Sequence, residues 1–271
     1  MNALGKGRVI ITGASGSMGA VAVEKLAASG FCVTMACRNL AKASGVRDAI
    51  FSRIPDADIE IRRLDLSSLE SVRYFAEGIE TPVLALFNNA GAISRGYSLT
   101  VDGLEHTFAV NYFGPWLLTQ LLLPRMADGA RVVNMVSLTC RFATIDESSL
   151  WPAEREFRQL GTYAAAKRAL LSFSMELARR NPSLVVNVAD PGIVASNMID
   201  LGHWYDPLAD ALFKPLCRKP EAGVEPALRA LASSEGGLYF SASGSWKIPG
   251  MYVDPALDER IWASTERFIS F

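Results

Sequence analysis

Residues 8–29 read RVIITGASGSMGAVAVEKLAAS, and this stretch decides the fold. The β-branched run at residues 8–12 predicts a short buried strand. A turn with three glycines follows at residues 13–19, and an Ala-, Val- and Leu-rich segment then predicts a helix to about Ser29. A strand, a glycine-rich turn and a helix in this order aim backbone N–H groups and a helix N-terminus at a phosphate. The stretch therefore predicts a phosphate-binding βα unit.

The same alternation continues along the chain. Further strands are predicted at residues 31–36, 59–64, 83–87, 131–136 and 184–189, with an edge strand at 237–240. Helices are predicted at about 41–51, 101–126, 223–232 and 254–269, and a central helix that contains Tyr163 is predicted to end at about Arg180. A further helix is predicted to begin at Ser67, because Ser67 with Glu70 fits a capping box. Strands separated by helix-length segments predict an α/β fold: one doubly wound parallel sheet of the Rossmann type, with helices on both faces.

Composition narrows the class of protein. The 271 residues are half hydrophobic and one-fifth charged, with a formal net charge of -1 and no block of like charge, so nucleic acid is not an expected partner. A chain of this length and pattern is expected to form a single domain, 1–271. The longest apolar run, residues 116–124, is too short to span a bilayer, which predicts a protein without a transmembrane segment.

Cysteine and histidine usage gives no sign of a metal site. Cys32, Cys37, Cys140 and Cys217 lack metal-ligand spacing, and the N-terminus lacks the features of a secretory signal. The two histidines are paired with no recognisable ligand set. We therefore expect free thiols in a reducing compartment, a cytoplasmic location and no metal.

One pair of residues suggests proton transfer. Tyr163 and Lys167 lie four positions apart in a predicted helix and therefore on one face of it. An adjacent ammonium stabilises phenolate, so the pKa of Tyr163 is expected to fall below its usual value near 10. Such pairs often arise by chance, but other chemically suggestive residues follow strand ends: Gly13, Arg38, Asp65, Asn88, Ser137 and Pro191. In a parallel sheet these ends meet at one edge, where ligands bind.

These motifs resemble the short-chain dehydrogenase/reductase family over nearly the whole chain. The matching positions are Thr12-Gly13-x-x-x-Ser17-x-Gly19, Asp65, Asn88-Asn89-Ala90-Gly91, Asn111, Ser137, Tyr163-x-x-x-Lys167 and Pro191-Gly192. Looser motifs, among them Ala36-Cys37-Arg38-Asn39 and Val110-Asn111-Tyr112-Phe113-Gly114, are similar to the retinol-dehydrogenase-like branch. The resemblance implies a cofactor half at about 1–130 and a catalytic and substrate half at about 131–271.

The resemblance also assigns roles to residues. Tyr163 is implied as the acid/base, Lys167 as the residue that lowers its pKa and binds the ribose, Ser137 as a donor to the substrate oxygen, and Asn111 as the anchor of a proton relay. Asp65 is implied as an adenine contact, and Asn88 with Gly91 as the lining of the ribose side. The full implied cofactor set is Gly13, Ser15, Ser17, Met18, Gly19, Arg38, Asp65, Leu66, Asn89, Ala90, Gly91, Tyr163, Lys167, Pro191, Gly192 and Val194.

One position departs from the family pattern. Ser17 stands where the family has the middle glycine of the phosphate turn. Glycine allows a close approach to the pyrophosphate and a positive φ, whereas a serine side chain can crowd the phosphate or hydrogen-bond to it. We expect a tolerated substitution, with loss of cofactor binding as the alternative.

The residues that follow the second strand are expected to determine which cofactor binds. NAD-binding proteins place an acid there for the ribose 2′-hydroxyl, but this chain has Ala36, Cys37 and Arg38. A guanidinium without a nearby carboxylate suits a 2′-phosphate, so NADP(H) is the expected cofactor.

Two segments are expected to build the substrate pocket. Residues 138–162 carry Arg141, Phe142 and Trp151 with a solvated Glu154-Arg155-Glu156 run, and residues 193–220 have the spacing of an amphipathic lid. Their apolar side chains favour a lipophilic carbonyl or alcohol as substrate. Reduction of a conjugated double bond and a non-catalytic NADP-binding regulatory role are the alternatives. The resemblance implies a homodimer or homotetramer.

Overall fold

The computed structural model describes residues 8–194 and 217–269 of the chain. Its centre is one eight-stranded sheet in the order β3-β2-β1-β4-β5-β6-β7-β8, in which only β8 runs antiparallel to its neighbour. The strands are β1 (Arg8–Thr12), β2 (Cys32–Cys37), β3 (Ile59–Arg63), β4 (Val83–Asn88), β5 (Met126–Met135), β6 (Val185–Ala189), β7 (Leu238–Ser241) and β8 (Gly244–Lys247). The predicted doubly wound α/β fold is confirmed.

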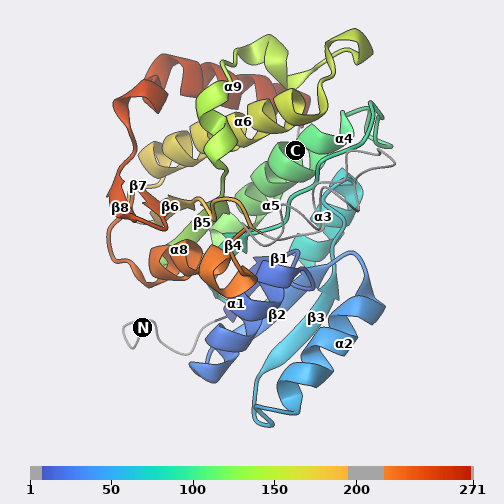
Figure 1. Cartoon of the computed structure of the whole chain (residues 1–271), viewed down its shortest axis with the longest axis vertical. Coiled ribbons are helices and arrows are strands. Elements are labelled where there is room, and N and C mark those ends of the chain that lie inside the picture. The colour runs from blue at the N-terminus through green and yellow to red at the C-terminus, as the bar shows by residue number, and fades with distance from the viewer. Residues whose placement is uncertain (1–7, 195–216, 270–271) are drawn as a thin grey trace.

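Helices cover both faces of this sheet (Figure 1). One face carries α1 (Ser17–Ala28), α2 (Leu40–Phe51) and α8 (Pro220–Ala232), and the other carries α3 (Leu69–Glu77), α5 (Gly114–Leu122), α6 (Gln159–Arg180) and α9 (Pro255–Phe268). A short helix α4 (His106–Phe108) and a π-helical segment η1 (Ala109–Phe113) precede α5. Within the described ranges, no helix is long and apolar enough to cross a membrane.

Strand β1 shows how the sequence builds two cores. Ile10 belongs to the hydrophobic cluster beneath α5 and α6, whereas Val9 and Ile11 belong to the cluster beneath α1 and α8. Successive strand residues point to opposite faces, so an uninterrupted apolar run fills both clusters. This double burial fixes the edge at which the loops following β1, β4 and β5 meet.

A buried polar network joins the middle strands to the helices above them. The Asn88 side-chain amide donates to Asn134 Oδ1 at 2.8 Å and to Thr119 Oγ1 at 3.2 Å. The Asn134 amide in turn donates to Ser174 Oγ at 2.8 Å. Because buried polar groups cost free energy unless they are hydrogen-bonded, this network fixes β4 and β5 against α5 and α6.

The boundaries of one predicted helix were wrong. Residues 101 and 102 form a turn, and Glu105 pairs with Leu99 in an isolated β-bridge. Glu105 also caps the helix that begins at His106 by accepting from the Phe108 amide at 2.9 Å. At the other end, Met126 already belongs to β5 and pairs with Val83 of β4. The apolar sequence did not reveal these local hydrogen bonds.

Two smaller predictions were also wrong. The N-cap of α3 is Ser68, whose hydroxyl accepts from the Ser71 amide, while the Ser67 hydroxyl donates to Asp65 at 2.6 Å. Strand β7 is not the sheet edge, because β8 pairs with it and takes that place. The four-residue β8 is exposed along most of its length and lacks the apolar run that marks a buried strand.

Candidate active site

The turn after β1 is held tightly against β4. Gly13 has a φ of +63°, and a Cβ atom there would lie 2.9 Å from Ala90 Cα. A Cβ atom on Gly19 would lie 2.8 Å from Ala14 Cα. Both positions therefore require glycine, one for its φ and both for space. The resulting turn delivers the chain directly into the N-terminus of α1.

Ser17 is the first residue of α1 and is exposed. Among the described residues, only glycines have a positive φ, so Ser17 lies in an ordinary helical conformation. The N-cap residue Gly16 has no side chain, which leaves the amides of the first turn without a side-chain acceptor. The backbone conformation therefore allows serine at this position, and the free amides of the helix N-terminus can still donate to an anion.

Residues after β4 close the other side of the turn. The Asn89 amide donates to the Thr12 carbonyl at 2.9 Å, and the Ala90 N–H donates to the Thr12 hydroxyl at 3.0 Å. Asn89 Oδ1 is buried and accepts no hydrogen bond from the residues that the structure describes. Gly91 is exposed at this edge. Asn88, by contrast, points into the buried network described above, so its expected place on the ribose side was wrong.

Two cationic residues lie after β2. Arg38 is exposed and makes no hydrogen bond or ion pair with the described part of the protein. Ser15 of the glycine-rich turn hydrogen-bonds to the Cys37 thiol, and the charge of Lys42 acts on the same thiol. Burial raises the pKa of Cys37 in spite of these contacts. The end of β2 thus carries positive charge directly beside the phosphate turn.

Asp65 follows β3 in a local turn. Its Oδ1 accepts from the Ser67 amide at 3.0 Å and from the Ser67 hydroxyl at 2.6 Å. The next residue, Leu66, is buried, and a Cβ atom on Gly114 of α5 would lie 2.9 Å from the Leu66 Cβ. Asp65 and Leu66 are therefore fixed at the edge that also holds the glycine-rich turn.

Ser137, Tyr163 and Lys167 lie together at the end of β5. Ser137 follows that strand and hydrogen-bonds to the Tyr163 hydroxyl. The Lys167 ammonium lies 5.8 Å from the centroid of the Tyr163 ring and donates to the Met135 carbonyl at 2.9 Å. Lys167 and Tyr163 are both buried. The predicted helix brings the pair together on one face, next to the predicted serine.

The expected fall in the pKa of Tyr163 was wrong for this structure. Burial raises the pKa of Tyr163 above its usual value, because removal from water destabilises the charged phenolate more than the neutral phenol. The Ser137 hydrogen bond opposes this effect, whereas the charge of the Cys140 thiolate, where it forms, and the charge of Asp190 add to it. Burial also lowers the pKa of Lys167, to about 8. The described site therefore favours the neutral phenol.

Asn111 lies within the π-helical segment η1. Its side-chain amide donates to the carbonyls of Ala92 and Thr107, each at 2.7 Å. In the same segment the Gly114 amide reaches back to the Ala109 carbonyl, five residues earlier. A π-turn of this kind alters the backbone groups that a helix presents. Asn111 thus ties the loop after β4 to a locally widened helix; no hydrogen bond in the described residues links it to Tyr163 or Lys167.

The end of β6 contributes the last predicted positions. Pro191 is buried, Gly192 has a φ of +71°, and the Val194 side chain packs on Gly223 of α8. Met18 of α1 contacts the same glycine. The structure therefore brings together Met18 and Val194, which lie 176 positions apart in the chain.

The segment between Ser137 and Tyr163 divides into exposed and packed parts. Phe142 is 79% exposed, and Arg141 and the run 154–156 are also exposed. Trp151 instead packs on Phe113 and Phe268, with ring centroids 4.9 and 4.5 Å away. The Trp151 ring therefore packs against the apolar side chains of η1 and α9. Most of the predicted lid, residues 195–216, lies outside the described residues.

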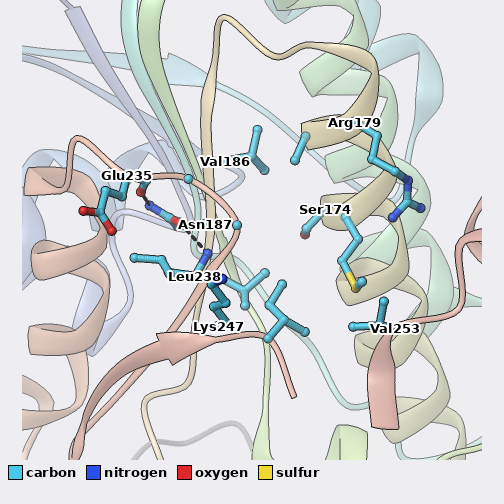
Figure 2. Close-up of a pocket in the computed structure, with 14 residues that line it drawn as sticks. Ser174, Arg179, Val186, Asn187, Glu235, Leu238, Lys247 and Val253 are labelled. Carbon is cyan, nitrogen blue, oxygen red and sulfur yellow. Dashed lines mark hydrogen bonds between the residues drawn. The ribbon is translucent and has the colours of Figure 1, made fainter. Parts of the chain in front are cut away.

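A cavity of about 580 Å³ lies elsewhere, between the second half of α6 and the strands β6 to β8 (Figure 2). Ser174 and Arg179 of α6 face Val186 and Asn187 of β6 across it. None of the predicted site residues lines this cavity. It is therefore distinct from the site at the carboxyl ends of the strands.

Sequence reasoning missed three residues that act on the site: Lys42, Asp190 and Tyr239. Lys42 lies in α2, and its charge acts on Cys37. Asp190 is buried between Ala189 and Pro191, and its carboxylate accepts from the Tyr239 hydroxyl at 2.7 Å. The sequence pattern marked Pro191-Gly192 but gave no signal that the preceding acid is buried or that a tyrosine of β7 contacts it.

The residues present fit a dinucleotide. The glycine cradle has no room for a Cβ atom, the N-terminus of α1 has no side-chain cap, and buried Asn89 Oδ1 can still accept a hydrogen bond. Backbone amides at a helix N-terminus bind the pyrophosphate in such folds. Gly13, Ser15, Ser17, Met18 and Gly19 would hold the phosphates. Within the described ranges, no cluster of three His, Cys, Asp or Glu side chains is arranged to hold a metal ion.

Comparison with known proteins gives close sequence relatives. Retinol dehydrogenase 12 of Homo sapiens is 33% identical over 267 residues, which cover 94% of this chain and 83% of that protein. The WW domain-containing oxidoreductase of Danio rerio is 32% identical over 279 residues, which cover 96% of this chain and 68% of that protein. Both alignments extend over nearly the whole chain.

Solved structures share the fold. A protein from Mycobacterium Paratuberculosis has a TM-score of 0.81 at 29% identity, over 97% of this chain and 93% of that one. A short-chain dehydrogenase from Sphingobium yanoikuyae in complex with NADPH has a TM-score of 0.66 at 21% identity, over 98% and 96% of the two chains. A Burkholderia phymatum short chain dehydrogenase/reductase in complex with NAD has a TM-score of 0.67 at 21% identity, over 88% and 89%.

The profile of the short chain dehydrogenase family matches residues 7–203, which include the phosphate turn, Ser137, Tyr163 and Lys167. The sequence relatives include retinol dehydrogenases 12 and 13. The chain therefore belongs to the short-chain dehydrogenase/reductase family, on its retinol-dehydrogenase-like branch, and is an NAD(P)-dependent oxidoreductase.

Proposed function

We propose that the protein interconverts an alcohol and a carbonyl on a lipophilic substrate, with NADP(H) as its cofactor and Tyr163 as its acid/base. The observation that carries this proposal is the hydrogen bond between Ser137 and Tyr163, with Lys167 beside them at the carboxyl end of β5. This arrangement provides a proton donor and a second hydroxyl at the same edge of the sheet as the glycine cradle.

The roles follow from the chemistry of these side chains. A bound nicotinamide cofactor supplies the hydride for reduction or accepts it in oxidation. The Tyr163 phenol, which burial keeps protonated at neutral pH, gives its proton to the substrate carbonyl oxygen. The Ser137 hydroxyl donates to the same oxygen and stabilises its developing charge. Lys167, with a pKa of about 8, keeps positive charge near the phenolate that forms.

Positive charge after β2 supports NADP(H) over NAD(H). Arg38 is exposed and has no partner in the described structure, and Lys42 lies close enough to act on Cys37. A ribose 2′-phosphate would find a cation at this position, whereas a ribose hydroxyl would find no carboxylate. The solved neighbours bind NADPH in one case and NAD in another, so the preference is proposed from these residues alone.

Exposed apolar side chains follow two of the site residues and support a lipophilic substrate. Leu138 comes directly after Ser137 and is 38% exposed, and Phe142 lies one helical turn further on. Ile193 follows Gly192 and is 65% exposed. Exposed apolar groups near a polar centre are typical of a binding surface. The names of the relatives add support, because retinol is a lipophilic alcohol.

Replacement of Tyr163 tests the proposal. Tyr163→Phe is expected to lower kcat for an aromatic ketone with NADPH by roughly 10²- to 10⁴-fold, because the proton donor is lost. NADPH affinity, measured by fluorescence titration, is expected to stay close to that of the unaltered protein. Tyr74→Phe is the matched control, since Tyr74 is 77% exposed on α3. Retained turnover in Tyr163→Phe would remove this residue from the proposed role.

A homodimer or homotetramer and a cytoplasmic location complete the proposal. Helix α9 packs against α6, and Trp262 of α9 also contacts Trp116 of α5. Residues 114–119 of α5 and 166–177 of α6 are buried within the single chain, so an assembly through these helices would have to use their few exposed residues, such as Arg179 and Arg180. Sedimentation equilibrium of the purified chain measures the assembly state, and a single monomeric species would contradict this part of the proposal.

A further inference from the structure

Asp190 is a buried acid beside the proposed acid/base centre. It is 4% exposed and follows the last residue of β6. Its Oδ2 accepts from the Tyr239 hydroxyl at 2.7 Å, and its Oδ1 accepts from the Gly192 amide at 2.8 Å. Both oxygens accept from N–H or O–H donors, which is the pattern expected of an ionised carboxylate.

These two hydrogen bonds connect three parts of the fold. The bond to the Gly192 amide closes a turn in which Gly192 has a φ of +71°. The bond to Tyr239 reaches β7, and the Tyr239 ring stacks on Trp246 of β8 at 5.8 Å between centroids. The Asp190 carboxylate therefore ties the turn after β6 to the β7–β8 hairpin, alongside the backbone hydrogen bond from the Asp190 N–H to the Phe240 carbonyl at 2.8 Å.

We propose that Asp190 is a positioning residue for the reaction, which fixes the Pro191-Gly192 turn through Tyr239 and Gly192 and places a negative charge beside Tyr163. The inference rests on the proposed function, because Tyr163 is the acid/base only there. Asp190 itself has no place in the glycine cradle or in the set Ser137, Tyr163 and Lys167.

The charge of Asp190 acts on groups from several elements. It raises the pKa of Tyr163 on α6, of Cys140 after β5 and of Tyr239 on β7. The positive groups that face the same region include Lys167 and Arg168 of α6, which lower the pKa of Cys140, and Arg218, which donates to the Pro191 carbonyl at 3.4 Å. Tyr252, after β8, also acts on Tyr239. If these other groups stay in place, removal of the Asp190 charge lowers the pKa of Tyr163 and makes its phenolate easier to form.

The first test is the pH profile of alcohol oxidation with NADP⁺. Oxidation needs Tyr163 as a base, so kcat/KM rises with pH as the phenolate forms. In Asp190→Asn this rising limb is expected to move to lower pH by about one unit, as for the removal of one nearby charge. Tyr239→Phe keeps the charge and loses only one hydrogen bond, so its limb is not expected to move down. A purely structural role would lower kcat/KM at every pH without shifting the limb.

Asp258→Asn is the matched control for loss of a buried carboxylate. Asp258 is fully buried on α9, where Arg179 donates to it at 2.8 Å, and its charge does not act on Tyr163. Its pH profile is expected to keep the limb of the unaltered protein. If Asp190→Asn does not fold, Asp190→Ser makes the same charge change and keeps a hydroxyl for the Gly192 amide. An unshifted limb in the folded variant would overturn the proposal.

A second test needs neither cofactor nor turnover. Burial raises the pKa of the Cys140 thiol to about 11, and Asp190 contributes to the rise. The pH midpoint of the NMR shift of 13C-labelled Cys140 Cβ, which needs no reagent to enter the buried site, is expected to fall in Asp190→Asn and to stay in Tyr239→Phe. Cys37 in the same sample is the internal comparison, because Asp190 does not act on it. If the unaltered protein turns over no substrate, the proposed function fails, and an unmoved Cys140 midpoint would separately refute the role of Asp190.

Discussion

The ring of Trp262 on α9 stacks on the ring of Phe173 on α6, with centroids 5.6 Å apart and planes inclined by 23°. Trp262 also meets Trp116 of α5 at 5.5 Å, and the Arg180 guanidinium lies 4.6 Å from its centroid. These contacts hold α9 on the same face of the sheet as α6, which carries Tyr163 and Lys167. Aromatic contacts of this size supply much of the energy of a core.

Truncation of Trp262 is expected to destabilise the whole fold. Trp262→Ala removes a buried ring and leaves a cavity, so the free energy of unfolding should fall by about 3–5 kcal/mol. Urea unfolding followed by circular dichroism measures the change. Tyr74→Ala, which removes an aromatic ring that is mostly exposed, should change it by less than about 0.5 kcal/mol. Equal losses in the two variants would show that α9 does not hold the core.

The glycine cradle predicts a contrast between two Gly→Ala changes. Gly19→Ala places a Cβ atom 2.8 Å from Ala14 Cα, so the phosphate turn must shift, at a cost of about 1–3 kcal/mol. NADPH affinity should fall with it. Gly45→Ala in α2 meets nothing within 4 Å and should stabilise the protein by about 0.5–1 kcal/mol. Urea midpoints and fluorescence titrations measure both effects. Unchanged NADPH affinity in Gly19→Ala would argue against this turn as the phosphate site.

Arg38 predicts cofactor preference. Arg38→Ala removes a charge-assisted contact to a 2′-phosphate, worth about 1.5–3 kcal/mol, and should weaken NADPH binding by roughly 10- to 100-fold. NADH binding should stay as it is, because NADH has no 2′-phosphate. Arg267→Ala on α9, an exposed arginine far along the chain, should leave both affinities unchanged. An equal loss for both cofactors would show that Arg38 does not read the 2′-phosphate.

Burial of Lys167 predicts a dependence of stability on pH. Its pKa is about 8 in the folded protein and 10.5 as its ordinary value, so between these values the unfolded chain binds more protons. Stability from this group therefore rises with pH across that window, by at most about 1.4 kcal/mol per pH unit. Lys167→Met removes the group, and its unfolding free energy should rise less steeply with pH than that of the unaltered protein.

Lys25→Met is the control for this comparison. The Lys25 side chain is 46% exposed and pairs with Glu225 on the surface. Its stability curve should run parallel to that of the unaltered protein between pH 8 and 10.5. Chemical unfolding at several pH values gives both curves. Parallel curves for Lys167→Met as well would contradict the lowered pKa of Lys167.

The sequence alone determined the layout of the protein. Apolar runs such as residues 8–12 and 83–87, separated by helix-length segments, permit little other than a parallel doubly wound sheet. Helical spacing placed Tyr163 beside Lys167, and the strand ends placed Ser137 and the glycine-rich turn at the same edge. These features depend on local periodicity and on a topology rule, and both can be read from a single chain.

Only the tertiary structure decided the electrostatics of the site. The sequence predicted a lowered pKa for Tyr163 from one neighbour, whereas burial and the charge of Asp190 raise it. It also placed Asn88 at the site, although that side chain bonds to Asn134 inside the core. A pKa depends on every group that surrounds an atom in space, and a side chain's partners depend on which strands lie side by side. Neither quantity follows from the spacing of residues along the chain.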